Sequence, residues 1–143
     1  MWILKIGGSW ITSNHLNELI DLLKKKTLTD NLIIVVGGGC FADSVRWAFR
    51  KKKMSMRTAN YLALKSTEIF AYMLKEIDKD IQLIKNIKSL KKKGSLKVWL
   101  PSKLLKEEPS FLKNWDSTSD SVAAWLYEKL NAKGLLFIKS LKL

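Results

Sequence analysis

The chain has 143 residues, of which 47% are hydrophobic, and it carries a formal net charge of +13. This composition excludes a low-complexity chain and supports one domain, residues 1–143, with its own core. No apolar run reaches the roughly 18 residues of a membrane helix, and the first six residues lack a signal-peptide pattern. The single cysteine, Cys40, agrees with a reducing compartment, so we predict a cytoplasmic protein.

The positive charge has two explanations. Dense lysine and arginine attract nucleic acids, so nucleic-acid binding is one hypothesis. The lysines, however, gather in short clusters at positions 24–26, 51–53 and 91–93. Each cluster lies in or beside an expected helix end or loop, where positive side chains are favourable without a ligand. We therefore favour a solvated surface, whose field also attracts an anionic small-molecule substrate.

Two strands that each run into glycines open the chain. Trp2 to Ile6 predicts a short buried strand followed by Gly7-Gly8-Ser9, and Leu32 to Val36 predicts a second one followed by Gly37-Gly38-Gly39. Between them, Asn14 to Lys26 has helical apolar spacing, with its first residue as the expected N-cap. This is a βαβ unit, and its parallel strands should bring both glycine turns to one edge of the sheet.

The second glycine turn is a candidate anion site. Three glycines leave no Cβ in the way, so backbone amides can approach an anion at the positive end of the following helix, which we expect to run from Asp43. A tight turn without a ligand is the alternative, but the pairing with the first turn favours an anion cradle. Lys5, just before the first turn, also needs solvent or an anion for its ammonium group.

The middle of the chain predicts a second helix and two more strands. The helix from Asp43 should end in the basic run Arg50 to Lys53, and a long helix should follow from about Arg57 to Ile77. Its expected apolar stripe, Leu62, Ile69, Met73 and Ile77, is core or dimer surface. Ile81 to Ile84 and Lys97 to Leu100 are candidate strands, the latter stopped by Pro101, with a polar connection over Lys85 to Gly94. His15 is expected on the surface.

Asp120 lies in a cluster of Asp, Ser and Thr residues before a run of helix formers that extends to about Leu130. Such a cluster is typical of a helix N-terminus, and local chemistry favours Asp120 as a cap. After Gly134, the residues Leu135 to Ile138 predict one more buried strand. No helix follows it to cover that strand, which is unusual in a parallel sheet.

Three motifs in this order resemble the amino acid kinase superfamily. They are Leu4 to Ser9, Ile34 to Arg46 and Thr118 to Ala124. The resemblance implies an α/β fold, a three-layer αβα sandwich with a mainly parallel sheet. The segments Trp99-Leu100-Pro101 and Trp115 to Asp120 look most similar to the branch that contains the aminomethylfuran phosphate kinase of C1-carrier cofactor synthesis.

The resemblance also implies a function. Members of the superfamily transfer the γ-phosphoryl group of ATP, with Mg²⁺, to a carboxylate or phosphate oxygen. Lys5 would bridge the phosphates and Asp120 would orient the catalytic lysines, while Gly7, Gly8 and Ser9 would line the donor phosphates.

The acceptor side follows from the same resemblance. Gly37, Gly38 and Gly39 would hold the acceptor and the transferring group. Arg46 would reach an anionic acceptor, with a surface salt bridge as its alternative. Asp116 would contact the acceptor or a metal, with helix capping as its alternative. No dedicated metal-ligand set is predicted.

The chain also departs from the superfamily pattern. Family members continue well past the strand matched by Leu135 to Ile138, into the segment that supplies the adenine pocket. A non-catalytic anion-binding subunit or remnant is therefore the alternative to a kinase. The family precedent and the long helix predict a homo-oligomer, a dimer or larger.

Overall fold

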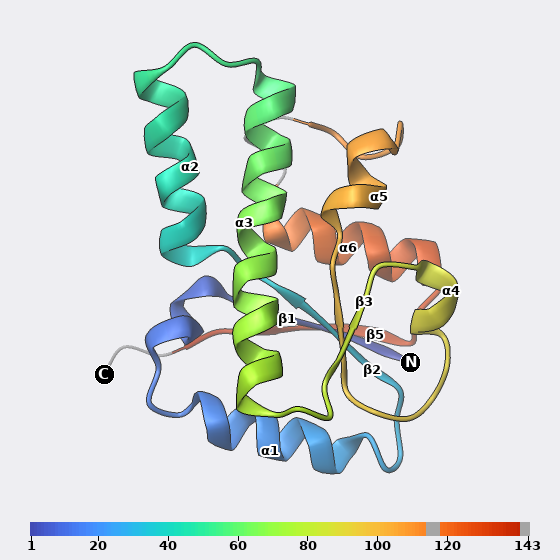
Figure 1. Ribbon diagram of the computed structural model, residues 1–143. Coiled ribbons are helices and arrows are strands. Elements are labelled where there is room, and N and C mark those ends of the chain that lie inside the picture. Colours follow the sequence, from blue (N-terminus) through green and yellow to red (C-terminus); the bar gives the residue numbers. More distant parts are fainter. Residues whose placement is uncertain (114–117, 141–143) are drawn as a thin grey trace.

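A five-stranded parallel sheet forms the centre of the molecule (Figure 1). The computed structural model describes residues 1–113 and 118–140. In spatial order, the strands are β3 (Gln82–Ile84), β4 (Lys97–Trp99), β2 (Leu32–Val36), β1 (Trp2–Ile6) and β5 (Gly134–Ile138). Each neighbouring pair is parallel. The predicted βαβ unit is confirmed, because β1 and β2 lie side by side in register.

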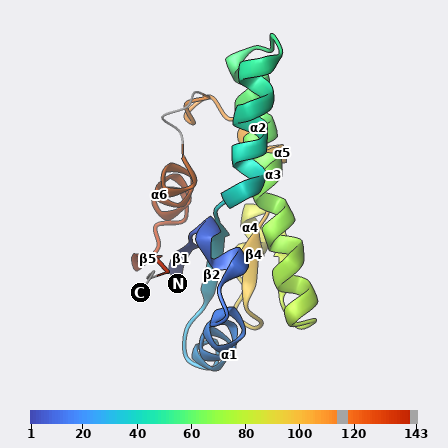
Figure 2. The ribbon, with the colours of Figure 1, turned by 90° about the vertical axis from the view of Figure 1, so that its left-hand side faces the viewer.

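Helices cover both faces of this sheet. They are the 3₁₀ turn η1 (Gly8–Thr12), α1 (Leu16–Lys26), α2 (Gly39–Lys51), α3 (Met56–Ile77), α4 (Ile87–Leu90), α5 (Ser102–Glu107) and α6 (Ser119–Leu130). Helix α1 and the C-terminal half of α3 pack on one face, and α4, α5 and α6 pack on the other. Helix α2 and the N-terminal half of α3 extend beyond the sheet as an antiparallel pair (Figures 1 and 2). The predicted αβα sandwich is thus confirmed.

The alternation of side chains along β1 determines which of its residues pack on which face of the sheet. Leu4 and Ile6 belong to the core on the side of α1 and α3. Ile3 belongs to the opposite core, and Lys5 faces the same side, toward α6. Because successive side chains of a strand point to opposite faces, the register of β1 alone places the ammonium group of Lys5 beside the start of α6.

Two helices begin at residues other than those predicted. Helix α1 begins at Leu16 with His15 as its N-cap, so the expected cap at Asn14 is wrong. The hydroxyl of Ser13 accepts the amide of His15 instead, which adds one turn before the helix. Helix α2 begins at Gly39 rather than Asp43, because the carbonyl of Gly38 already accepts amides from the first helical turn.

Most residues of the apolar stripe predicted on α3 lie outside the core. Leu62, Ile69 and Ile77 are exposed. The buried face carries Phe70 and Leu74, together with Ala59, Leu64 and Ala71. Helix α3 is apolar on more than one side, and only its contact with the sheet and with α2 and α5 decides which side is buried.

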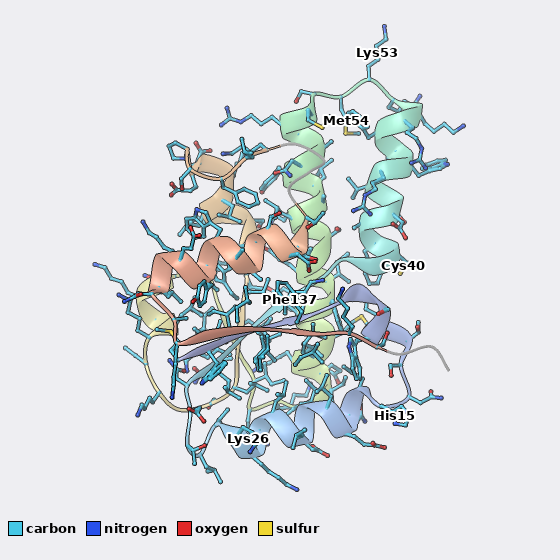
Figure 3. The ribbon with its side chains drawn as sticks, turned by 180° about the vertical axis from the view of Figure 1, so that it is seen from behind. His15, Lys26, Cys40, Lys53, Met54 and Phe137 are labelled. Atoms are coloured by element: carbon cyan, nitrogen blue, oxygen red, sulfur yellow. The ribbon has the colours of Figure 1, made fainter. Side chains whose placement is uncertain are left out.

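The last strand is not buried as predicted. Leu136 and Phe137 are 50% and 45% exposed, and Phe137 lies in the open on β5 in Figure 3. Strand β5 pairs only with β1 and forms the edge of the sheet. Because Leu136 and Phe137 are consecutive, their side chains point to opposite faces, so this edge strand is incompletely covered on both faces of the sheet.

Three short elements add to the predicted ones. The turn η1 follows the first glycines, α4 lies inside the expected polar connection, and α5 follows Pro101. Leu90 of α4 and Leu105 of α5 are fully buried. Among residues 1–113 and 118–140, no helix is long and apolar enough to cross a membrane.

Candidate anion-binding site at the glycine turns

The two glycine turns are in direct backbone contact. A Cβ atom built on Gly8 would lie only 2.2 Å from the backbone nitrogen of Gly39, and one built on Gly37 would lie 2.7 Å from the nitrogen of Gly8. Real Cβ atoms essentially never come within 3.0 Å of other heavy atoms, so neither position has room for a side chain. The predicted neighbourhood of the turns is confirmed, and the reason is close approach of two backbones.

The start of helix α2 supplies free backbone amides at these turns. In the described part of the chain, the amides of Gly38 and Gly39 have no intramolecular acceptor. Gly39 also takes a left-handed backbone with φ 51°, which favours glycine. Helix α2 starts here, next to η1, as the position of Cys40 in Figure 3 shows. Unsatisfied amides at a helix N-terminus attract anions.

Lys5 and Asp120 form an ion pair beside the turns. The Lys5 Nζ and Asp120 Oδ1 atoms are 2.8 Å apart, with side chains 14% and 51% exposed. Asp120 lies in the first turn of α6, whose N-cap is Thr118. The predicted capping role of Asp120 is therefore wrong, since its carboxylate holds Lys5. The ammonium group also lies 3.8 Å from where a Cβ atom of Gly7 would be.

A cavity of about 190 Å³ opens between the turns, α2, α3 and α6. Gly8 and the three glycines at 37–39 line one side of it, and Thr118 and Ser119 of α6 line another. Arg46 also lines the cavity. Its guanidinium nevertheless donates to Asp43, at 2.9 Å from Oδ1, in an exposed pair on the same helix.

The remaining predicted residues lie elsewhere. Gly7 and Ser9 are not among the residues that line the cavity. The Ser9 hydroxyl instead makes a 2.6 Å hydrogen bond with the hydroxyl of Ser140. The Asp116 prediction falls outside the described residues. Lys5, with Asp120, lies at the rim of the turns and not in the lining of the cavity.

Helix α3 contributes polar residues that the sequence interpretation missed. Asn60 and Thr67 line the cavity and are only 2% and 8% exposed. The Thr67 hydroxyl donates to the carbonyl of Leu64 at 2.7 Å. A signal was present, because two polar residues seven positions apart lie on the same face of an apolar helix.

The arrangement suits an oxyanion such as a phosphate or a carboxylate. It combines free amides, two helix N-termini and a lysine fixed by an aspartate. Among the described residues, no group of three or more His, Cys, Asp or Glu side chains is placed to hold a metal ion. A divalent cation would therefore depend on oxygen atoms of its ligand, as Mg²⁺ commonly does with nucleotides.

Together, the parallel αβα sandwich and the paired glycine turns define an α/β domain with a candidate oxyanion site. The chain belongs to the Amino acid kinase family, whose sequence profile matches residues 1–95. A curated relative, the [5-(aminomethyl)furan-3-yl]methyl phosphate kinase of Methanocaldococcus jannaschii, is 28% identical over 140 residues. That alignment covers 95% of this chain and 64% of the relative, so the chain spans less than two thirds of that protein.

Solved structures agree on the fold. Uridylate kinase from Archaeoglobus fulgidus matches with a TM-score of 0.72 and 19% identity, covering 99% of this chain and 63% of that one. UMP kinase from Ureaplasma parvum matches with a TM-score of 0.63 and 18% identity, covering 95% and 67%. At this identity the likeness concerns the fold.

Proposed function

We propose that this chain belongs to an ATP-dependent small-molecule kinase and binds the acceptor of the phosphoryl group. The acceptor is a phosphate or carboxylate compound, as in the aminomethylfuran phosphate kinase to which the chain is similar. The observation that carries this proposal is the contact between the two glycine turns, with free amides and the pair Lys5 and Asp120 at their rim.

Each part of the site has a role in this proposal. The amides of Gly38 and Gly39 hold an oxygen of the acceptor or of the transferring group, since they have no acceptor within the described chain. Lys5 neutralises negative charge between the two reacting phosphates. Asp120 keeps the ammonium group directed toward the turns. Phosphoryl transfer depends mainly on such positioning and charge neutralisation.

ATP and Mg²⁺ are the proposed cofactors. When bound, they supply the transferring phosphoryl group and part of the positive charge that stabilises it. The residues present fit the phosphate end, because the free amides of Gly38 and Gly39 and the ammonium group of Lys5 lie at the paired turns. Lys5 would hold phosphate oxygens, and its ion pair with Asp120 would keep its ammonium group in place. By similarity, we place the reaction in the synthesis of a C1-carrier cofactor.

The test is transfer of the γ-phosphoryl group from labelled ATP with Mg²⁺ to a panel of phosphomonoesters and carboxylates. We expect one acceptor class to be phosphorylated, and we expect Lys5→Gln and Asp120→Asn to reduce the rate by at least about 100-fold. Lys79→Gln is the matched control, because it breaks an exposed lysine pair with Glu76 away from the turns. No transfer to any acceptor at millimolar ATP would refute the kinase proposal.

A protein that binds an oxyanion without transferring a phosphoryl group is the second proposal. It is supported by the fact that the turns, Lys5 and Asp120 all lie within a chain spanning 64% of the curated relative. Calorimetric titration separates the two proposals. Tight binding of ATP with Mg²⁺ by this chain argues for the kinase, whereas binding of inorganic phosphate without ATP binding argues for the second.

We also propose a homo-oligomer. An apolar groove between α2 and α3 is lined by Phe41, Val45, Leu62 and Ile69, and the last two are exposed. A second copy of the chain would cover it. Sedimentation of the protein and of Ile69→Asp tests this, and a monomer in both cases would refute it. Nucleic-acid binding stays the alternative that we do not favour, and a cytoplasmic location stays a prediction from composition.

A further inference from the structure

The connection between α2 and α3 carries a concentrated positive charge. Between Asp43 and Glu68 the sequence has seven lysine or arginine residues and no aspartate or glutamate. Five of the seven are exposed around this connection, namely Arg50, Lys51, Lys52, Lys53 and Arg57. We refer to these five cations, with Trp47, Met54 and Met56, as the basic tip. Within residues 1–113 and 118–140, no ion pair includes any of the five cations.

Helix geometry explains only part of this charge. Two of the cations, Arg50 and Lys51, lie in the last turn of α2, where positive charge is favourable. The next two follow that helix, and Arg57 lies in the first turn of α3, where no acidic residue is present and a cation opposes the helix dipole. The lysine cluster at positions 24–26, by contrast, has two ion pairs with carboxylates. The charge of the basic tip is therefore uncompensated by the described part of the chain.

Exposed apolar side chains accompany these cations. Trp47 is 58% exposed and lies three and four residues before Arg50 and Lys51, so the three side chains share one face of α2. Met54 lies half-buried in the connection, and Met56 is 38% exposed at the start of α3. A surface that combines cations with large apolar side chains suits a partner that offers both negative charge and hydrocarbon.

The two helices hold the basic tip away from the rest of the molecule. Helix α2 and the N-terminal half of α3 extend beyond the sheet, and Lys53 and Met54 lie at their far end (Figures 2 and 3). The apolar groove that we assign to a second copy of the chain is lined by none of the residues of the basic tip. A flat partner can therefore meet the tip without covering the sheet or the glycine turns.

We propose that the basic tip binds the surface of a lipid bilayer that contains anionic phospholipids. The five cations meet the lipid phosphates, Trp47 lies at the level of the headgroups, and the two methionines enter the boundary with the acyl chains. A nucleic acid would also attract the cations, but Met54 and Met56 have no aromatic face on which a base could stack. The observations therefore favour the bilayer. This inference goes beyond the proposed function and does not depend on it.

The experiment is cosedimentation of the whole chain with lipid vesicles at about 0.15 M salt. One set of vesicles is phosphatidylcholine alone, and the other contains about one third phosphatidylglycerol. We expect binding to the anionic vesicles only. In the triple variant Lys51→Gln, Lys52→Gln and Lys53→Gln, the partition coefficient should fall about 100-fold, because each lysine near an anionic surface contributes roughly a factor of five. Absence of binding by the unaltered protein, or equal binding to both sets, would overturn the inference.

A second triple variant is the matched control. Lys91→Gln, Lys92→Gln and Lys93→Gln remove the same charge from an exposed cluster at the end of α4, so this variant should keep its binding. An equal loss in both triple variants would show an effect of net charge alone and would overturn the inference. Trp47→Ser should weaken binding about tenfold, whereas Leu28→Ser, at an 86% exposed site after α1, should not. Unchanged affinity in Trp47→Ser would also overturn the inference.

Competition separates the bilayer from a nucleic acid. Single-stranded or duplex DNA is added to the vesicle-bound protein until the concentration of DNA phosphate equals that of accessible lipid phosphate. We expect the protein to stay with the vesicles, because DNA offers no hydrocarbon to the apolar side chains of the basic tip. Transfer of the protein to either DNA would overturn the inference in favour of a nucleic-acid partner.

Discussion

Replacing Gly8 by alanine tests the contact between the glycine turns. The new Cβ atom would lie 2.2 Å from the nitrogen and 2.4 Å from the Cα atom of Gly39, and 3.1 Å from the carbonyl carbon of Gly38. All three atoms are backbone, so no side chain can rotate away. One of the turns must shift, and the shift disturbs the amides that we expect to hold the anion.

The expected cost of Gly8→Ala follows from this geometry. Overpacking costs roughly 1–3 kcal/mol when side chains can adjust. Because the obstruction is backbone, we expect the upper end, about 3 kcal/mol of unfolding free energy. For a chain of this size, that corresponds to a fall in Tm of about 10 °C.

Gly7→Ala is the matched control. A Cβ atom at Gly7 would have only ordinary contacts at 3.8 Å, and its backbone, with φ −65° and ψ 155°, suits any residue. Its Tm should therefore stay unchanged or rise slightly, since alanine restricts the unfolded chain. Thermal unfolding of both variants, followed by circular dichroism, decides the matter. Equal melting of Gly8→Ala and Gly7→Ala would refute the contact between the turns.

Three other predictions concern stability. Burial lowers the pKa of Lys97 below its usual value, so its protonated form is disfavoured in the folded state. The free energy of unfolding should therefore rise as the pH increases from the pKa of Lys97 in the folded state to its pKa in the unfolded state. In urea titrations at about pH 7 to 10, Lys97→Met should remove this rise. Trp99→Ala, at a fully buried site, should lower the free energy of unfolding by about 3–5 kcal/mol in the same assay. A similar loss in Trp47→Ala, at an exposed site, would contradict the burial argument. Glu68→Ala removes the acceptor of the Ser102 amide, at 2.9 Å, and should lower the free energy of unfolding by about 1–3 kcal/mol. An unchanged midpoint of the urea titration would show that this hydrogen bond contributes nothing to stability.

The strands and glycine turns could be predicted because local pattern determines them. Five apolar residues in β2 are all buried, and Cβ atoms at Gly37 and Gly39 would lie within 3.0 Å of the backbone of Gly8. The exposed side of α3 and the edge position of β5 could not be predicted. Apolar residues such as Ile69 and Phe137 carry no local sign of whether another element covers them.

The site was predictable in part for the same reason. Lys5 and the glycines were identified from sequence neighbours, and their family resemblance pointed to Asp120. Local chemistry alone assigned Asp120 to helix capping, because its true partner lies 115 positions earlier in the chain. Asn60 and Thr67 were missed because a polar residue on a long helix becomes a site residue only when a cavity forms next to it.

The pairing of β1 with β5 has a consequence for how the protein is made. Strand β1 aligns Trp2 with Gly134, at opposite ends of the described chain. During synthesis, β1, α1 and β2 leave the ribosome first, but Lys5 then has no carboxylate and β1 has one unpaired edge. The carboxylate partner of Lys5 and the second partner strand of β1 are supplied only when α6 and β5 emerge. We therefore expect anion binding only once α6 and β5 are present, and nascent chains that end before residue 120 should not bind phosphate at the turns.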